Sequence, residues 1–249
     1  MTRVSQSSKP NKPRVGITVH VAEVEAKEGH PEWRFQMGAR YAQVVAEAGG
    51  IPLLLPTHAA AAADHGAVLD SVDALLISGG GSIPGQYFVD NPDPSLRDTN
   101  PARYDFEVEL IRGAWVRGMP LLGICRGHQT IAEALQGGPA LNLGVMAGAR
   151  EHYQTEVPTQ TTHEAYFEEG TRLAGWLGSS GHINSFHRQV IERVPAGWRV
   201  GAYSDDGFVE AMEAETGFGV GVQFHPEWLL ESQPAYGQLF AEFVAAARR

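Results

Sequence analysis

The only cysteine of the chain, Cys125, stands where a short apolar run gives way to a helical pattern. Residues 121–124 read Leu-Leu-Gly-Ile, which is typical of a buried strand, and residues 130–135 favour a helix. A strand-to-helix corner exposes the sulfur, and the N–H groups and dipole of the following helix favour the nucleophilic thiolate. A free cysteine is also often just a small buried hydrophobe, so the segment alone leaves both interpretations open.

A cysteine nucleophile needs a base, and the base needs a group that orients it. Among the ten histidines, His225 has the most suggestive surroundings, because an apolar strand pattern over residues 221–224 ends in His225-Pro226-Glu227. Proline ends sheet pairing, and a carboxylate two residues after the imidazole can accept its hydrogen bond and fix its tautomer. The alternative is an ordinary surface histidine and glutamate at the end of a strand.

A third group of residues could stabilise an oxyanion. Gly79, Gly80 and Gly81 follow an apolar strand pattern over residues 74–78. Glycine allows backbone conformations that present bare N–H groups, and the N–H of Arg126, directly after the cysteine, is a natural second donor. A plain glycine turn is the alternative.

The elements that must position these residues alternate along the first half of the chain. Apolar strand patterns occur at residues 14–19, 51–56, 74–78 and 121–124. Helical patterns run from Trp33 to residue 48, over residues 59–69 and over residues 103–116, and a long surface loop is expected at residues 82–100. Continuously apolar strands between helices predict a mainly parallel sheet covered on both faces, with ligands bound at the carboxyl ends of the strands.

The second half of the chain has a different character. Shorter strand patterns appear at residues 161–167, 198–203, 207–214 and 219–224, and an amphipathic helix is expected at residues 233–247. We expect these strands to be mostly antiparallel additions to the sheet. The interpretation is a disordered tail over residues 1–13 and one α/β domain over residues 14–249.

Composition and charge narrow the class of protein. The 249 residues are 43% hydrophobic and 19% charged, as in an ordinary soluble globular protein, and the net charge of −10 argues against nucleic acid as a partner. That charge is compatible with a cationic small substrate. A single cysteine excludes an internal disulfide, no apolar run is long enough to span a membrane, and the polar start lacks a signal core, so we expect a cytoplasmic protein. No histidine pair has a familiar metal-binding spacing, so no metal is expected.

The combined motifs resemble a known family. Gly123-Ile124-Cys125-Arg126-Gly127-His128-Gln129, Phe224-His225-Pro226-Glu227 and Gly79-Gly80 are similar to the nucleophile, His-Pro-Glu and oxyanion-loop motifs of class I glutamine amidotransferases. The closest resemblance is to the gamma-glutamyl-gamma-aminobutyrate hydrolase branch. Further shared features are Ala48-Gly49-Gly50-Ile51-Pro52, Arg103 with Phe106-Glu107, Asn184-Ser185-Phe186-His187 and Asp206-Gly207-Phe208-Val209-Glu210-Ala211.

The resemblance implies a three-layer flavodoxin-like α/β sandwich and a Cys-His-Glu hydrolase that cleaves a γ-glutamyl amide through a thioester. Cys125 would be the nucleophile, His225 the acid and base, and Glu227 its orienting group. The N–H groups of Gly80 and Arg126 would bind the oxyanion. Substrate contacts would come from Gly79, Gly81, Tyr87, Gln129, Asn184, Ser185 and His187. Neither a metal nor an organic cofactor is implied.

Several residues depart from the pattern of the branch, and we expect all of them near the substrate. They are the loop at residues 82–87, Tyr104, His128, residues 139–143 and Arg188. They leave the leaving-group amine open between γ-aminobutyrate, a polyamine and other amines. Two alternatives are the glutaminase subunit of an amidotransferase that delivers ammonia to a separate synthetase, and a non-catalytic binding protein. The expected partner is a small γ-glutamyl molecule, with no nucleic acid or membrane partner, and a homodimer is left open.

Overall fold

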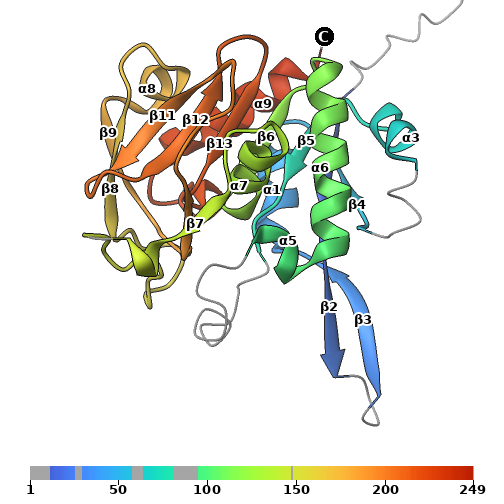
Figure 1. Ribbon diagram of the computed structural model, residues 1–249. Helices are drawn as coiled ribbons and strands as arrows, with labels where there is room; N and C mark the ends of the chain where they lie inside the picture. The colour runs from blue at the N-terminus through green and yellow to red at the C-terminus, as the bar shows by residue number, and fades with distance from the viewer. Residues whose placement is uncertain (1–11, 26–29, 58–63, 81–94, 147, 249) are drawn as a thin grey trace, which may run out of the picture.

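One mixed sheet of nine strands runs through the computed structural model, which describes residues 12–25, 30–57, 64–80, 95–146 and 148–248 (Figure 1). In spatial order the strands are β4 (Ile51–Leu55), β1 (Arg14–Thr18), β5 (Ala74–Ile77), β6 (Leu121–Ile124), β13 (Gly219–Val222), β12 (Val209–Ala214), β11 (Trp198–Ser204), β8 (His163–Phe167) and β9 (Ser180–Ile183). From β4 to β13 all neighbours are parallel, and from β13 to β9 all are antiparallel. This arrangement confirms the predicted fold class.

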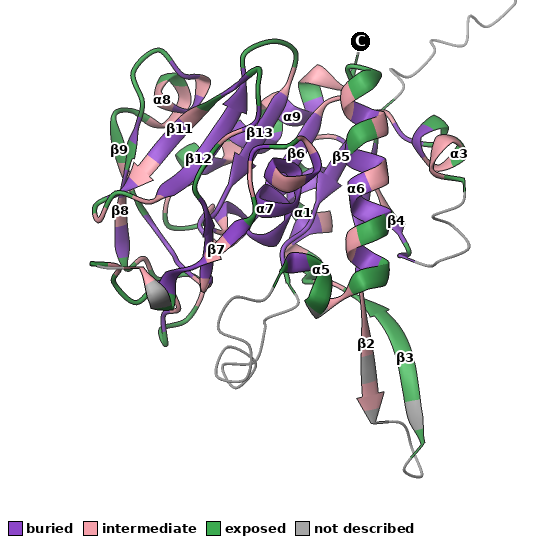
Figure 2. Ribbon diagram, in the orientation of Figure 1, coloured by how far each residue is buried: buried purple, intermediate pink, exposed green. Residues whose placement is uncertain are grey.

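Helices cover both faces of the sheet. On one face lie α1 (Ala39–Glu47), α8 (Arg172–Leu177) and α9 (Gly237–Ala246), and on the other lie α3 (His65–Asp70), α6 (Pro101–Val116) and α7 (Arg126–Ala134). Alternate residues of β5 point to opposite layers, because Leu76 joins the first core and Leu75 joins the second. The buried sheet between the exposed outer faces of the helices is visible in Figure 2.

The register of the parallel strands brings the candidate chemistry together. β6 lies between β5 and β13, with Leu121 opposite both Leu75 and Gly219. The carboxyl ends of these three strands therefore meet at one edge, where the glycine segment, Cys125 and His225 follow them.

A hairpin of β2 (His20–Glu25) and β3 (Pro31–Gln36) replaces the start of the helix predicted from Trp33. Trp33 lies in β3 and is 68% exposed, and the helix begins only at Ala39. The two-residue spacing of Trp33 and Phe35 is typical of a strand and not of a helix, and β3 pairs with β2 along its whole length. The hairpin projects away from the sheet (Figure 1).

The structure describes only part of three other predicted segments. The helix expected at residues 59–69 is α3, since residues 58–63 lie outside the described residues. The loop expected at residues 82–100 contains α5 (Leu96–Thr99), which begins with a capping box of Ser95 and Asp98, while residues 81–94 lie outside the described residues. The expected tail likewise falls outside them, apart from residues 12 and 13.

Short elements complete the second half. β7 (Ala140–Asn142) pairs with β10 (Gln189–Ile191), and η2 (Leu143–Val145) and η3 (Pro226–Trp228) are single turns. The predicted closing helix is divided into η4 (Pro234–Tyr236) and α9. Within the ranges described, no helix combines the length and apolar character needed to cross a membrane.

Candidate active site

Cys125 occupies a strained elbow between β6 and α7. Its backbone has φ 53° and ψ −109°, outside the regions that a residue with a side chain prefers, and its N–H donates to the carbonyl of Val222 over 2.8 Å. The elbow is tight enough to require glycine at position 127, where a Cβ atom would lie 2.0 Å from the carbonyl oxygen of Ile77. A strained strand-to-helix turn of this kind exposes the side chain of the nucleophile at the edge of the sheet.

His225 lies between the cysteine and a buried carboxylate. Its Nδ1 is 2.7 Å from Oε1 of Glu227, and His225 lines the same cavity as Cys125. Burial lowers the pKa of His225, but the charges of Glu227 and Cys125 prevail and raise it well above its usual value. The arrangement therefore favours the protonated form of the His225 imidazole.

Asn184 fixes the backbone of His225 from both sides. Its Oδ1 accepts from the N–H of His225 over 2.8 Å, and its Nδ2 donates to the carbonyl oxygens of His225 and Pro158 over 3.1 and 2.7 Å. Asn184 is fully buried and does not line the cavity. The structure thus places Asn184 behind the histidine, where it holds the backbone, and its substrate contact stays a prediction.

Tyr41, on α1, touches two parts of the site and was not predicted as a functional residue. Its hydroxyl accepts from the N–H of Gly79 over 3.1 Å and lies 3.4 Å from Nδ1 of His225. Burial, together with the nearby Glu227 charge, raises the pKa of Tyr41 well above its usual value. The neutral phenol therefore links the glycine segment to the histidine.

A buried ionic network holds the glycine segment in place. Arg103 donates to the carbonyl oxygens of Ser78, Gly79 and Gly80 over 2.7, 3.3 and 3.0 Å, and to Oε1 of Glu107 over 2.7 Å. Arg103 therefore binds the carbonyl oxygens of all three of these residues. Gly80 has a φ of 89°, in the left-handed region that favours glycine.

The same carboxylate binds the first residue of α7. Nη1 of Arg126 donates to Oε2 of Glu107 over 2.8 Å, and Nη2 donates to the carbonyl of Leu96. Thr18 also donates to Glu107, over 2.7 Å. One buried carboxylate therefore anchors both sides of the predicted oxyanion site, the glycine segment and the start of the helix after Cys125.

A cavity of about 250 Å³ opens onto the cysteine. Its lining residues are Gly80, Leu96, Cys125, Arg126, Gln129, Tyr153, Pro158, Phe186, His187, Arg188, Gln189, His225 and Trp228. Of the predicted site residues, the structure thus brings Cys125, His225, Gly80, Arg126, Gln129 and His187 together around one space, with Glu227 behind His225. The predicted Gly81 and Tyr87, and the unusual loop at residues 82–87, lie outside the described residues.

The other predicted residues support the cavity wall. Nε2 of Gln129 donates to the carbonyl of Gln189 over 2.6 Å and to Gln223, so this side chain braces the wall that it also lines. Ser185 is fully buried and donates to the carbonyl of His152. Gly79 does not line the cavity, and its N–H donates to the hydroxyl oxygen of Tyr41.

The residues that depart from the branch pattern do not all lie near the cavity. Tyr104 donates to Glu133 and His128 is fully buried against Gly221, so neither lines the cavity, and their expected proximity to the substrate stays a prediction. Among the departing residues that the structure describes, Arg188 lines the cavity, with its guanidinium stacked 3.6 Å from the ring centre of Tyr153.

Nucleophile, imidazole, carboxylate and backbone donors at one sheet edge are the parts needed for acyl transfer. An α/β sheet with a cysteine on such an elbow and a His-Pro-Glu segment after the adjacent strand defines the class I glutamine amidotransferase fold. The model of the Peptidase C26 family matches residues 13–227, and the chain belongs to this family of cysteine-dependent γ-glutamyl amide hydrolases.

Individual relatives agree with this assignment. The chain is 35% identical to "Putative glutamine amidotransferase Rv2859c" of Mycobacterium tuberculosis, over 95% of this chain and 75% of the relative. It is 29% identical to gamma-glutamyl-gamma-aminobutyrate hydrolase PuuD of Escherichia coli (strain K12), over 96% and 94%. The crystal structure of a putative GMP synthase subunit from Thermoplasma acidophilum superposes with a TM-score of 0.65 at 18% identity, covering 95% of this chain and 94% of that one, which supports the fold.

Proposed function

We propose that this chain hydrolyses a γ-glutamyl amide, with Cys125, His225 and Glu227 as its catalytic residues. The thiolate of Cys125 attacks the γ-carbonyl carbon, and the N–H groups of Gly80 and Arg126 hold the negative oxygen that forms. His225 gives its proton to the leaving nitrogen as the C–N bond breaks, which releases the amine and leaves a γ-glutamyl thioester. The neutral imidazole then takes a proton from water as its oxygen attacks the thioester carbonyl, and the C–S bond breaks, which releases glutamate and restores the thiolate and the protonated imidazole.

One observation carries the proposal: the strained Cys125 and His225 line the same cavity, and His225 is bonded to the buried Glu227. Burial of an unused cysteine would need neither the strained backbone nor an adjacent histidine and carboxylate. The clamp from Asn184 and the network around Glu107 fix these groups before substrate arrives, as preorganised catalysis requires.

The charge of the cavity favours an anionic leaving group. Among the described residues that line it, none is acidic, whereas Arg126 and Arg188 carry guanidinium groups. The guanidinium of Arg188 can bind a substrate carboxylate. We therefore favour a γ-glutamyl conjugate of an amino acid such as γ-aminobutyrate over a polyamine conjugate, in keeping with the name of the E. coli relative.

The test is a hydrolysis screen of purified protein against glutamine, γ-glutamyl-γ-aminobutyrate, γ-glutamyl peptides and γ-glutamyl polyamines, with glutamate release as the readout. We expect turnover of an anionic conjugate, no turnover by Cys125→Ala with an unchanged circular dichroism spectrum, and a covalent adduct on Cys125 from an electrophilic glutamine analogue. Full activity of Cys125→Ala would overturn the mechanism. Turnover of glutamine alone, and only with an added synthetase, would favour the ammonia-delivering alternative.

A further inference from the structure

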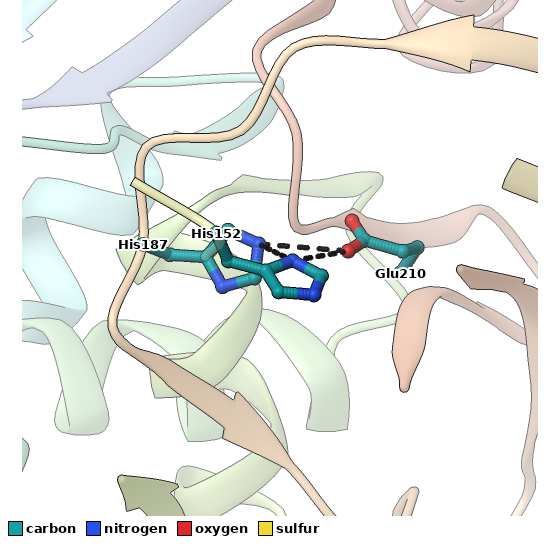
Figure 3. A group of neighbouring side chains, drawn as sticks. All are labelled: His152, His187 and Glu210. Carbon is teal, nitrogen blue, oxygen red and sulfur yellow. Dashed lines mark hydrogen bonds and ion pairs between the residues drawn. The ribbon is translucent and has the colours of Figure 1, made fainter. Parts of the chain in front are cut away.

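Three polar side chains from separate segments meet behind the cavity wall formed by residues 186–189 (Figure 3). His152 follows η2, His187 lies between β9 and β10, and Glu210 belongs to β12. Nδ1 of His152 lies 3.3 Å from Nε2 of His187, and each nitrogen lies 3.5 Å from Oε1 of Glu210. Their side chains are at most 2% exposed, so the three atoms form a nearly equilateral triangle in the interior.

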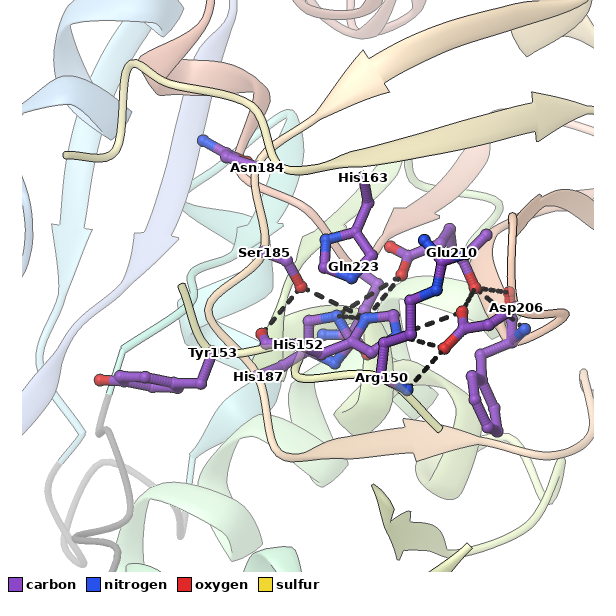
Figure 4. Close-up of polar contacts among 12 residues, drawn as sticks. Arg150, His152, Tyr153, His163, Asn184, Ser185, His187, Asp206, Glu210 and Gln223 are labelled. Carbon is purple, nitrogen blue, oxygen red and sulfur yellow. Dashed lines mark hydrogen bonds and ion pairs between the residues drawn. The ribbon is translucent and has the colours of Figure 1, made fainter. Parts of the chain in front are cut away.

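The outer nitrogens of the two rings show where the protons sit. Nδ1 of His187 lies 3.1 Å from the carbonyl oxygen of Gln189, which can only accept, so this nitrogen carries a hydrogen. Nε2 of His152 lies 3.1 Å from the carboxylate of Asp206 and therefore carries one as well (Figure 4). In neutral rings the two inner nitrogens are then bare, and their lone pairs face one another.

Glu210 and Ser185 also present acceptors at the triangle. Neither carboxylate oxygen of Glu210 receives a hydrogen bond from the part of the chain that the structure describes. Oγ of Ser185 lies 3.3 Å from Nδ1 of His152, but it donates its hydrogen to the carbonyl of His152 over 2.8 Å, so it too turns a lone pair inward. A buried centre surrounded by lone pairs and a carboxylate calls for a cation.

We infer that this cluster binds one divalent metal ion of the zinc class through His152, His187 and Glu210. Tetrahedral zinc with nitrogen and oxygen ligands at about 2.0–2.1 Å places those ligands about 3.4 Å apart, which is the spacing of the triangle. Two imidazoles favour zinc over calcium or magnesium, which prefer oxygen ligands. Ser185 or a water molecule completes the coordination, and Asp206 and the Gln189 carbonyl orient the rings from outside.

A single shared proton is the competing explanation for the cluster. A single proton could bond only one pair of the three atoms at a time. The separations of 3.3–3.5 Å between these nitrogen and oxygen atoms are also long for a hydrogen bond between charged partners. A metal ion at the centre reaches all three atoms together. Sequence spacing does not indicate such a site, because the ligands come from three segments that only the folded sheet brings together.

The metal would hold the cavity wall in place and take no part in bond breaking. The Gln189 carbonyl accepts both from His187 and from Gln129, so the wall carrying Arg188 is tied to the cluster on one side and to α7 on the other. The ion would fasten this wall to β12. The inference uses none of the proposed catalytic groups, so the failure of either proposal leaves the other intact.

The experiment uses full-length Cys125→Ala protein, which removes the thiol as a competing ligand, after treatment with a chelator. Zn²⁺ is titrated in competition with a chromogenic chelator, bound metal is counted by elemental analysis, and Co²⁺ is added to record ligand-field absorption. We expect one equivalent of Zn²⁺, a tetrahedral Co²⁺ spectrum and a higher unfolding temperature with metal. Glu210→Gln and His187→Gln should each weaken Zn²⁺ binding about 100-fold or more.

The matched control is His163→Gln, because His163 stacks on His152 with ring centres 4.3 Å apart and supplies no ligand. It should retain one equivalent of Zn²⁺. If the parent protein binds no Zn²⁺ at one equivalent, or binds it equally well in Glu210→Gln and His187→Gln, the inference is wrong, even if those variants unfold more easily. A nuclear magnetic resonance spectrum showing His152 doubly protonated in the presence of Zn²⁺ would also overturn it.

Discussion

Nδ1 of His225 lies 2.7 Å from Oε1 of Glu227, whose side chain is only 1% exposed. Burial alone would lower the pKa of His225, yet the charges of Glu227 and Cys125 raise it well above its usual value. The imidazolium consequently persists through neutral pH and loses its proton only in alkaline solution. At that point the thiolate loses its ion-pair partner and the leaving amine loses its proton donor.

Replacing the carboxylate by its amide tests this relationship. Glu227→Gln removes the charge that raises the pKa of His225, so we expect the alkaline limb of kcat/KM to move to lower pH and kcat to fall about 10²- to 10⁴-fold. The control is Glu231→Gln, since Glu231 is an exposed carboxylate on the same segment that pairs with Arg40. An unchanged pH profile in Glu227→Gln would show that the carboxylate does not act through the histidine.

Tyr41 should matter to activity through the glycine segment. Tyr41→Phe leaves the buried N–H of Gly79 without its acceptor, which costs about 1–3 kcal/mol of stability, and we expect kcat to fall about tenfold with little change in KM. Tyr104→Phe is the matched control, because it removes a hydroxyl that donates to Glu133 away from the cavity. It should lose stability without losing activity. Equal kcat losses in both variants would contradict a positioning role for Tyr41.

The central strands were predictable because their sequence is apolar without interruption. Residues 74–77 and 121–124 are buried on both faces, so no periodic pattern competes with the strand interpretation. The elbow at Cys125 was predictable for a related reason, since the apolar run stops at one residue and a helical pattern starts directly after it. Local sequence decides both features.

The supporting contacts were not predictable, because they join residues far apart in sequence. Tyr41 reads as one more apolar position of α1, and nothing near it indicates that its hydroxyl meets Gly79 and His225. Asn184 matches a family segment, yet its function as a backbone clamp depends on β9 ending beside the His-Pro-Glu turn. Trp33 was assigned to the helix that follows it, although its two-residue spacing from Phe35 is typical of a strand, and its pairing with β2 is set by the fold.

Glu107 is expected to be the most sensitive buried charge near the site. Its side chain is 0% exposed and pairs with Arg103 and Arg126, so Glu107→Gln leaves two buried guanidinium groups without a counter-charge. We expect a loss of about 3–5 kcal/mol in the free energy of unfolding, measured by urea denaturation. Asp105→Asn, on the same helix but in a half-exposed pair with Arg97, should cost less than about 1 kcal/mol. Similar losses in the two variants would contradict this account of the network.

His128 should make the fold sensitive to acid. Burial lowers its pKa from 6.5 to about 3, so the folded protein keeps the ring neutral while the unfolded chain takes up a proton below pH 6.5. Stability is therefore lost as the pH falls, by about 2 kcal/mol between pH 7 and pH 5 for this group. His128→Leu should reduce the difference in unfolding free energy between those two pH values by that amount. An identical difference in the variant and the parent would show that His128 is not the source.

Arg188 should select the leaving group. It lines the cavity with its guanidinium stacked on Tyr153, and a charge-assisted bond to a substrate carboxylate contributes about 1.5–3 kcal/mol, or about 10- to 150-fold in KM. For Arg188→Gln we expect KM for γ-glutamyl-γ-aminobutyrate to rise by that factor while KM for glutamine changes less than threefold. Arg112→Gln, which removes an exposed guanidinium paired with Glu109 on α6, should change neither value. An equal rise for both substrates would instead place Arg188 at the glutamyl carboxylate that the two share.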